Sequence, residues 1–179
     1  MNRIEKDALG EQQVPADALW GIHTRRALDN FRVTGLHVHP ALITALAAVK
    51  KACCLANLEL GYLPENTAKA ILLACDEILA GEHADQFPLD PVQGGAGTST
   101  NMNINEVIAN RAIEILGGQR GQYTIVDPLE HVNLHQSTND VYPTAVKVAA
   151  ISRLRVLSQE IASLQGAFQR KEKEFAAIP

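Results

Sequence analysis

The sequence predicts a mainly α-helical protein: a small N-terminal helical domain with short extended pieces, followed by the first long helix of a central helical bundle. Apolar residues recur at helical spacing after Pro40 and again after Pro64. No proline interrupts the chain between Pro143 and Pro179, and this span contains a single glycine. Residues 122–128 have local β character, but they are too few for a sheet of their own. These observations favour helices throughout.

The first forty residues are predicted to be irregular. Pro and Gly in 14–21 and 32–40 indicate turns and short extended pieces. From Pro40 the pattern becomes helical and continues to Gly61, where a helix stop is expected. The apolar residues of this helix recur at spacings of four, three and four: Leu42, Leu46, Val49 and Cys53. Lys50 and Lys51 are interpreted as solvated residues of the same helix.

Two further helices are predicted before the long C-terminal one. The second begins near Pro64 and ends at Gly81. Its apolar side is formed by Ile71, Leu72, Cys75, Ile78 and Leu79. The third covers 103–116 and stops at a Gly-Gly pair. The chain's three cysteines, Cys53, Cys54 and Cys75, do not form a disulfide framework, so we expect reduced core residues.

The C-terminal helix is the most informative element for the architecture. Its apolar residues recur at spacings of three and four: Ile151, Leu154, Leu157, Ile161, Leu164 and Phe168. A helix of about thirty residues would be roughly 45 Å long, and no other predicted element could cover it. It therefore needs partners from further sequence or from other subunits. We expect an N-terminal fragment of a longer protein, with 1–140 as an N-terminal domain and 141–179 as the start of a bundle domain.

The composition excludes several classes of function. Hydrophobic residues make up 46% and charged residues 20% of the chain, which is typical of soluble globular proteins. The net charge of −4 argues against non-specific nucleic-acid binding. No apolar run reaches the roughly 18 residues of a membrane span, and the N-terminus is too polar for a signal peptide. The expected compartment is the cytoplasm.

Two short segments are rich in hydroxyl and amide side chains. GGAGTSTNMNINE (94–106) contains three glycines, two threonines, a serine and three asparagines, and HQSTND (135–140) follows later. Ser, Thr and Asn commonly cap helices, so each segment alone is explained by capping. Such neutral donors can also surround an anion, and a helix start adds backbone N–H groups. Together, the two segments favour a pocket for a small carboxylate.

Both segments resemble signature regions of the aspartase/fumarase superfamily. GGAGTSTNMNINEVIANRA (94–112) and HVNLHQSTNDVYPTA (131–145) are similar to two of its three signatures, and 3–31 is similar to its opening segment. The resemblance covers nearly the whole chain. Class II fumarases typically have Ser where this chain has Ala96, so GGAGTS is more similar to the aspartate ammonia-lyases. HVN (131–133) also resembles that branch.

The resemblance implies elimination of ammonia from L-aspartate to give fumarate, through a carbanion whose charge spreads onto the adjacent carboxylate as an aci-carboxylate. Four residues would hold this carboxylate: Thr98, Ser137, Thr138 and Asn139. Four others would shape the pocket, with the asparagines acting within its loop: Ser99, Asn101, Asn103 and His135. No organic cofactor is implied. Some members are stimulated by Mg²⁺, but no ligand cluster in this sequence predicts a metal site.

Some expected residues are absent or replaced. The family's catalytic base is a serine on a GSSxMPxKxNP loop, and no such motif occurs in the 179 residues. We therefore assign no catalytic residue to this chain and expect it to be inactive alone, since family active sites combine residues from three subunits of a homotetramer. His135 stands where Ser is usual; it could alter substrate choice or pH dependence, or point away. Asp127–Glu130 replaces the usual HPND, so a second anion site is not predicted.

Two alternatives stay open. The chain could belong to a class II fumarase, or another fumarate-forming lyase, and Leu19-Trp20 resembles the fumarase form of the opening segment. It could also belong to a non-catalytic, crystallin-like structural protein on the lyase scaffold. Retention of all four carboxylate residues argues against the structural protein.

Overall fold

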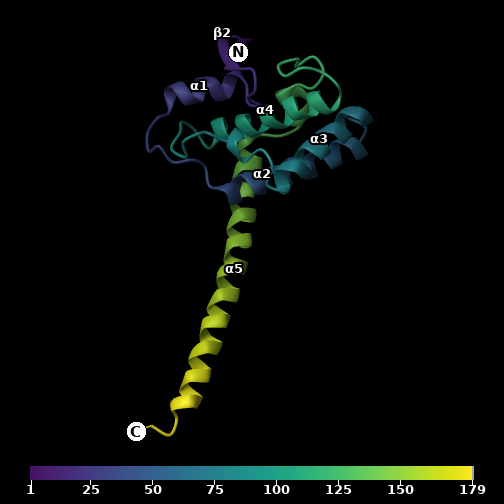
Figure 1. Cartoon of the computed structure of the whole chain (residues 1–179). Helices are drawn as coiled ribbons and strands as arrows, with labels where there is room; N and C mark the ends of the chain where they lie inside the picture. The colour runs from purple at the N-terminus through teal and green to yellow at the C-terminus, as the bar shows by residue number, and fades with distance from the viewer. Residues whose placement is uncertain (179) are drawn as a thin grey trace.

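A computed structural model describes residues 1–178, which form a helical head from which one long helix projects (Figure 1). The elements are β1 (Asn2–Asp7), β2 (Gly10–Pro15), α1 (Ile22–Asn30), α2 (Pro40–Glu59), α3 (Glu65–Leu79), the 3-10 turn η1 (Ala84–Gln86), α4 (Thr98–Ile115), the π-helical turn η2 (Pro128–Val132) and α5 (Thr138–Phe175). The prediction of a mainly α-helical chain is confirmed.

The N-terminal region is more regular than predicted. β1 and β2 form an antiparallel hairpin in which Asp7 lies opposite Gly10. The Asp7 carboxylate closes the turn by accepting a hydrogen bond of 2.9 Å from the Leu9 amide. α1 follows the hairpin, and the prediction of an irregular segment was wrong here. α1 buries three of its residues, Ile22, Thr24 and Ala27, so it lacks a strong apolar pattern.

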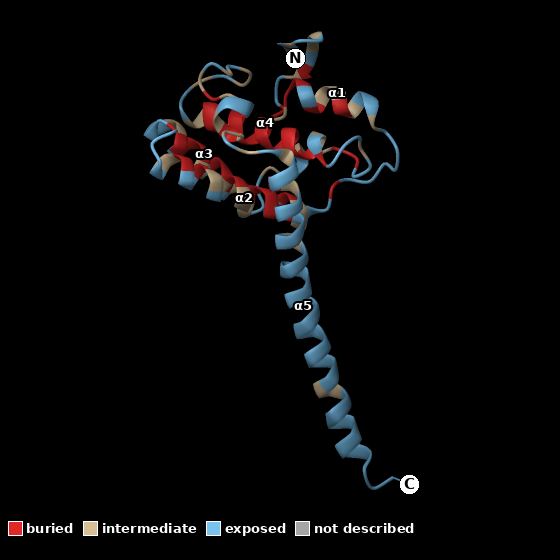
Figure 2. Cartoon of the chain, turned by 180° about the vertical axis from the view of Figure 1, so that it is seen from behind, coloured by how far each residue is buried: buried red, intermediate tan, exposed pale blue. Residues whose placement is uncertain are grey.

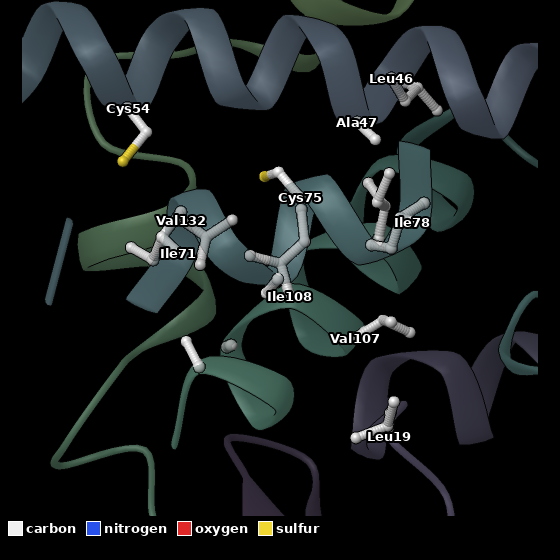
Figure 3. Close-up of a cluster of buried hydrophobic side chains, with 14 of the residues drawn as sticks. Leu19, Leu46, Ala47, Cys54, Ile71, Cys75, Ile78, Val107, Ile108 and Val132 are labelled. Atoms are coloured by element: carbon white, nitrogen blue, oxygen red, sulfur yellow. The ribbon is translucent and has the colours of Figure 1, made fainter. Parts of the chain in front are cut away.

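The hydrophobic core lies where α2, α3 and α4 meet (Figure 3). Leu46 of α2, Cys75 of α3 and Ile108 of α4 are each fully buried. The cysteines are free thiols, as predicted, although Cys53 is half-buried and not a core residue. Burial raises the pKa of Cys54 to about 11 and that of Cys75 to about 12, so both thiols are neutral near pH 7.

The buried face of α2 differs from the predicted one. It consists of Ile43, Ala45, Leu46, Ala47, Lys50, Cys54 and Asn57. Lys50 is 1% exposed, so its interpretation as a solvated residue was wrong. Leu46, Lys50 and Cys54 are four residues apart and face the same side of the helix. The Lys51 side chain, in contrast, is partly exposed and pairs with Asp76 of α3.

α2 is the most apolar helix of the described residues. By length and composition alone it could cross a membrane, with a mean hydropathy of 1.5 over 18 residues, although Lys50 and Lys51 interrupt its apolar run. Its packing against α3, α4 and α5 accounts for that apolar character.

α4 crosses the head between α1 and α3 and is buried on every side from Thr100 to Asn110 (Figure 2). It begins at Thr98, five residues before the predicted start at 103. The polar residues that looked like a loop are therefore the first turns of a central helix. Its buried asparagines and Glu106 make hydrogen bonds to other segments, which compensates for part of the loss of water around them, although the side-chain oxygens of Asn101 and Asn105 have no partner within residues 1–178.

α5 begins within the head and then extends away from it (Figure 2). It starts at Thr138 and contains Pro143, whereas we expected the helix to follow that proline. Val141 and Ala145 are its buried residues, and they lie near its start, where α5 packs on α2. Further along, the predicted apolar positions are exposed, with Leu157 at 53% and Phe168 at 68%. The division into domains at 140/141 stays a prediction.

Candidate functional site

The N-terminal turns of α4 and α5 lie against each other. Gly97 precedes α4 with a φ of 84°, a left-handed conformation that glycine adopts easily. A Cβ at this position would clash with the ring of Tyr142, so the two backbones can approach closely. The Asn101 side-chain amide of α4 donates a 3.0 Å hydrogen bond to the Thr138 hydroxyl of α5. We call residues 97–101 and 137–142 the paired helix starts.

All four residues predicted to hold a carboxylate are in the paired helix starts. Thr98 is the first residue of α4 and is exposed. Ser137 is the N-cap of α5, and its Oγ accepts a 3.2 Å hydrogen bond from the Asn139 amide. Thr138 is half-buried, and Asn139 is exposed. The capping interpretation therefore holds for Ser137. Binding of a carboxylate by these four residues stays a prediction.

The start of α4 has free donors for an anion. The N-cap residue Gly97 has no side chain, the Thr100 amide donates a 2.8 Å hydrogen bond to the Gln93 side-chain oxygen, and the first turn contains no acidic residue. The backbone N–H groups of Thr98 and Ser99 have no acceptor within residues 1–178. The N-terminal end of a helix also carries a positive partial charge, equivalent to roughly half an elementary charge. An anion between the paired helix starts would therefore meet backbone donors as well as hydroxyl groups.

The predicted pocket-shaping asparagines act within a helix and not within a loop. Asn101 and Asn103 are each 1% exposed in α4. Asn101 contacts the start of α5, whereas Asn103 donates a 3.1 Å hydrogen bond to the Gln86 carbonyl on another side of the helix. Ser99 lies half-buried in the first turn. Asn101 is thus placed to orient the paired helix starts, and Asn103 is placed to anchor η1.

His135 is attached to the C-terminal part of α2 and its following turn. It has a φ of 57°, which non-glycine residues seldom adopt. Its Nδ1 lies 2.9 Å from Asn57 Oδ1, and its ring meets that of Tyr62 edge-on at a centroid distance of 4.6 Å. These contacts favour the alternative in which the imidazole points away from Ser137 and Asn139. Any effect of His135 on substrate choice stays a prediction.

A partly buried polar network joins the paired helix starts to α2, and only two of its members, Asn101 and Thr138, were named as site residues from the sequence. The network consists of Lys50, Asn101, Asn105, Asn133, Gln136 and Thr138. Its centre is Asn133 Oδ1, which accepts hydrogen bonds from Lys50 Nζ at 2.8 Å and from the side-chain amides of Asn101 and Asn105 at 3.2 Å each. Within residues 1–178, Lys50 has no ion-pair partner. Burial lowers its pKa to about 7.

Comparison with known proteins identifies the family. A family model described as Lyase matches residues 10–179. An aspartate ammonia-lyase of a Bacillus species is 49% identical over 176 residues, covering 98% of this chain and 38% of the relative. The chain belongs to the aspartase/fumarase superfamily of lyases. It spans about two fifths of the length of the aspartate ammonia-lyases that it matches.

Other relatives of this lyase chain are named as fumarases or as a fumarate lyase, and not as aspartate ammonia-lyases. A class II fumarate hydratase of Nitrosomonas europaea is 57% identical over 153 residues, covering 86% of this chain and 33% of the relative. A Brucella melitensis structure described as fumarate lyase:delta crystallin superposes with a TM-score of 0.97 at 49% identity, over 99% of this chain and 42% of that one. A class II fumarase from Schistosoma mansoni gives a TM-score of 0.79 at 38% identity, over 83% of this chain and 32% of its own.

A second buried site in the lyase chain joins α4 to the start of α1. The Glu106 carboxylate accepts hydrogen bonds from the amides of Gly21, His23 and Thr24, and Glu5 accepts one from Ile22. The first four N–H groups of a helix have no partner within it, and here two side chains from other elements supply the acceptors. Burial raises the pKa of Glu106, and these hydrogen bonds oppose that shift. This site positions α1 and lies apart from the paired helix starts.

One further cluster has the residue types of a metal site. Ligand atoms of Glu77, Glu82 and His83 lie within 4.8 Å of one another. However, Arg111 binds both carboxylate oxygens of Glu77, at 2.6 and 2.8 Å, and this contact lowers the pKa of Glu77 to about 2. His83 Nε2 lies 2.7 Å from the same carboxylate. We therefore assign the cluster to ion pairing between α3 and α4 and not to metal binding.

Proposed function

We propose that this chain provides the substrate-carboxylate side of the active site of an aspartate ammonia-lyase, which converts L-aspartate to fumarate and ammonia by anti elimination. The observation that carries the proposal is that the two helix starts containing Thr98 and residues 137–139 lie against each other, joined by the Asn101–Thr138 hydrogen bond. The aspartate ammonia-lyases that match 98% of the chain support it. So does Ala96, which resembles that branch of the superfamily.

In this reaction a base removes a proton from the carbon next to one carboxylate. The C–H electron pair moves onto that carboxylate, giving an aci-carboxylate dianion, and then forms the double bond as ammonia leaves the adjacent carbon. The hydroxyls of Thr98 and Ser137 and the amide of Asn139 are neutral donors to oxygens that gain charge. Donors placed in advance around developing charge contribute several kcal/mol to catalysis. The free amides at the start of α4 would add to this effect.

We propose that this chain binds the substrate carboxylate and that the residue acting as the general base lies outside this chain. The base is proposed to be a serine on a GSSxMPxKxNP loop, which does not occur in this sequence. The isolated chain should therefore produce no fumarate. Accumulation of fumarate from L-aspartate by the purified 179-residue chain, followed by ultraviolet absorbance, would overturn this part of the proposal.

The proposed assembly is a cytoplasmic homotetramer that binds a small dicarboxylate or amino acid. The support comes from α5, whose exposed apolar residues extend far beyond the head (Figure 2). An amphipathic helix of this length needs an apolar partner surface. Copies of the same helix can provide one.

Class II fumarase is the second candidate, and the fumarate hydratase that is 57% identical supports it. Leu19-Trp20 also resembles fumarases, but this pair lies in the packed head. Leu19 is 2% exposed, and its carbonyl accepts a hydrogen bond from Asn110. Leu19 therefore has a structural role in the head, and its resemblance to fumarases is weak support for a malate substrate. A crystallin-like structural protein is the third candidate, and the description of the Brucella relative supports considering it.

The test is a parallel assay of the full-length gene product, whose sequence also shows whether the GSSxMPxKxNP loop is present. L-Aspartate, L-malate and argininosuccinate are supplied separately, and fumarate is followed by ultraviolet absorbance. Our proposal expects activity with L-aspartate. Activity with malate alone would establish the fumarase alternative. Inactivity with all three, in a folded protein whose gene lacks the loop, would favour the structural protein.

A further inference from the structure

Lys50 is a buried amino group for which the proposed chemistry gives no role. It is 1% exposed in the middle of α2, among apolar residues of the core. Burying an ammonium group without a carboxylate partner is costly. A sequence that folds around such a group needs hydrogen-bond acceptors in fixed positions. The acceptors here are two side-chain amide oxygens, those of Asn133 and Gln136, at 2.8 and 2.9 Å.

Both acceptors belong to the turn that leads into α5. The Asn133 side chain donates a 2.9 Å hydrogen bond to the Gln136 carbonyl, so it fixes the turn from within. The Gln136 side chain donates to the carbonyls of Val132 and Leu134, at 2.9 and 3.3 Å. Lys50 therefore holds the two side chains that define the path of the backbone between η2 and Ser137.

The same contacts reach the start of α4. Asn133 Oδ1 accepts hydrogen bonds from Lys50 and Asn101, and the Asn101 amide also donates to the Thr138 hydroxyl. A single ammonium group thus connects α2 to both paired helix starts. Lys50 donates two hydrogen bonds to side chains of the turn, and an apolar side chain of similar length could not make these hydrogen bonds.

We propose that Lys50 is a positioning residue for the carboxylate site: through Asn133 and Gln136 it holds the 133–137 turn so that Ser137 and Thr138 face Thr98. This inference rests on the proposed function, because it assumes that these residues bind a carboxylate. Lys50 itself touches neither substrate nor reacting atoms in this proposal. Its low pKa, about 7, is consistent with tight enclosure by these groups; Cys53 and Cys75 are the titratable groups that face it.

The test compares Lys50→Met with Lys51→Met in the 179-residue chain. Methionine keeps the length and helix preference of lysine but removes the donors. Amide hydrogen exchange is followed at Gln136 and Asn139, with α3 amides as a reference. We expect exchange at the two turn amides to become about tenfold faster in Lys50→Met, with α3 much less affected. Lys51→Met, which removes the pair with Asp76 of α3, should leave exchange at the two turn amides unchanged. Equal acceleration everywhere would mean that Lys50 contributes to general stability alone, and the proposal would fail.

Succinate, a non-reactive dicarboxylate, separates this inference from the proposed function. In the unaltered chain it should shift the NMR signals of Thr98 and residues 137–139, and Lys50→Met should weaken its binding by about tenfold. If succinate shifts none of these signals in the unaltered chain, the carboxylate site fails, and the exchange data alone decide whether Lys50 holds the turn. If Lys50→Met does not fold, Gln136→Leu removes one Lys50 acceptor, and the same local increase in exchange is expected. Unchanged exchange in that variant would refute the proposal.

Discussion

Glu106 of α4 accepts two hydrogen bonds from Thr24 of α1, one from the hydroxyl at 2.7 Å and one from the backbone amide at 3.1 Å. The residues are 82 positions apart, and both are almost fully buried. A helix normally takes its N-terminal cap from its own preceding residue. The residue before α1 is Gly21, which has no side chain to act as a cap, so α4 supplies the cap instead. The Glu106 carboxylate therefore links the packing of α1 against α4 to the capping of α1, to which Glu5 adds one further acceptor.

Glu106→Gln tests this dependence. The substitution preserves shape but places an NH₂ group against backbone N–H donors, so at least one buried donor loses its acceptor. We expect a loss of about 2–4 kcal/mol in the free energy of unfolding, measured by urea denaturation. Glu160→Gln on the exposed part of α5 is the control and should change stability by less than about 0.5 kcal/mol. Similar small effects from both would show that the carboxylate is not needed as a cap.

Gly21→Ala tests the space between the two capping carboxylates. The backbone of Gly21 is extended, with a φ of −123°, so alanine is compatible with its conformation. However, a Cβ there would lie 2.7 Å from Glu5 Oε2, 2.9 Å from Glu106 Oε1 and closer still to the Tyr123 hydroxyl. We expect destabilisation of about 1–3 kcal/mol by thermal and urea unfolding.

Gly166→Ala is the matched control for this substitution. Gly166 lies within α5, and the nearest atom to an added Cβ would be the end of the Arg170 side chain at 3.5 Å. Alanine should stabilise the helix by about 0.5–1 kcal/mol. Destabilisation by both changes would point to a general intolerance of added methyl groups and not to crowding at Gly21.

Much of the head could be predicted from the sequence because its helices have apolar residues at regular spacing. The second predicted helix matches α3 closely, with Ile71, Cys75 and Ile78 buried. α1 and the hairpin were missed because long-range contacts stabilise them. The cap of α1 comes from Glu106, and the hairpin is tied to α1 by the Arg26–Asp7 ion pair. Contacts between residues far apart in the sequence produce no periodic pattern within the segment itself, so they could not be predicted.

The sequence indicated two polar segments at helix starts, and α4 and α5 begin in these segments. Thr98 and residues 137–139 were named within them through the resemblance to the superfamily, and their binding of a carboxylate stays a prediction. Lys50 was misassigned because a lysine is usually solvated, although its spacing of four from Leu46 and Cys54 indicated the buried face. The roles of Asn133 and Gln136 could not be predicted, because they depend on the approach of α2 to a turn more than eighty residues away.

The free energy of unfolding should depend on pH through Lys50. Its pKa is about 7 in the folded chain and near 10.4 in an unfolded one. Between these values the unfolded state binds more protons, so stability rises with pH, by at most about 1.4 kcal/mol per unit. Relative to Lys50→Met, the unaltered chain should therefore gain stability from pH 7 to pH 9. The cysteines titrate in both chains and largely cancel in this comparison. If the difference in the free energy of unfolding between the unaltered chain and Lys50→Met is the same at every pH, the prediction is wrong.

Thr98→Val should weaken binding of dicarboxylates with little effect on the fold. Valine has nearly the same shape as threonine but lacks the hydroxyl, and Thr98 is exposed in the first turn of α4. Loss of a hydrogen bond to a charged oxygen costs about 1.5–3 kcal/mol, which corresponds to at least tenfold weaker binding. Succinate titration followed by NMR measures the change. Thr144→Val, at an exposed hydroxyl of α5 that donates to the Asp140 carbonyl, should bind succinate normally. Equal affinities in both variants would remove Thr98 from the site.

Self-association should depend on the exposed apolar side of α5. Leu157 and Leu164 are seven residues apart, so they lie on the same side of the helix, and they are 53% and 57% exposed. Replacing both with Glu should shift the chain toward the monomer in sedimentation velocity, because two charges would have to be buried between helices. Gln159 and Ser163 lie on the opposite side of α5, and replacing both with Glu adds the same charge. If this control pair dissociates the chain equally, charge repulsion and not the apolar side of α5 governs association.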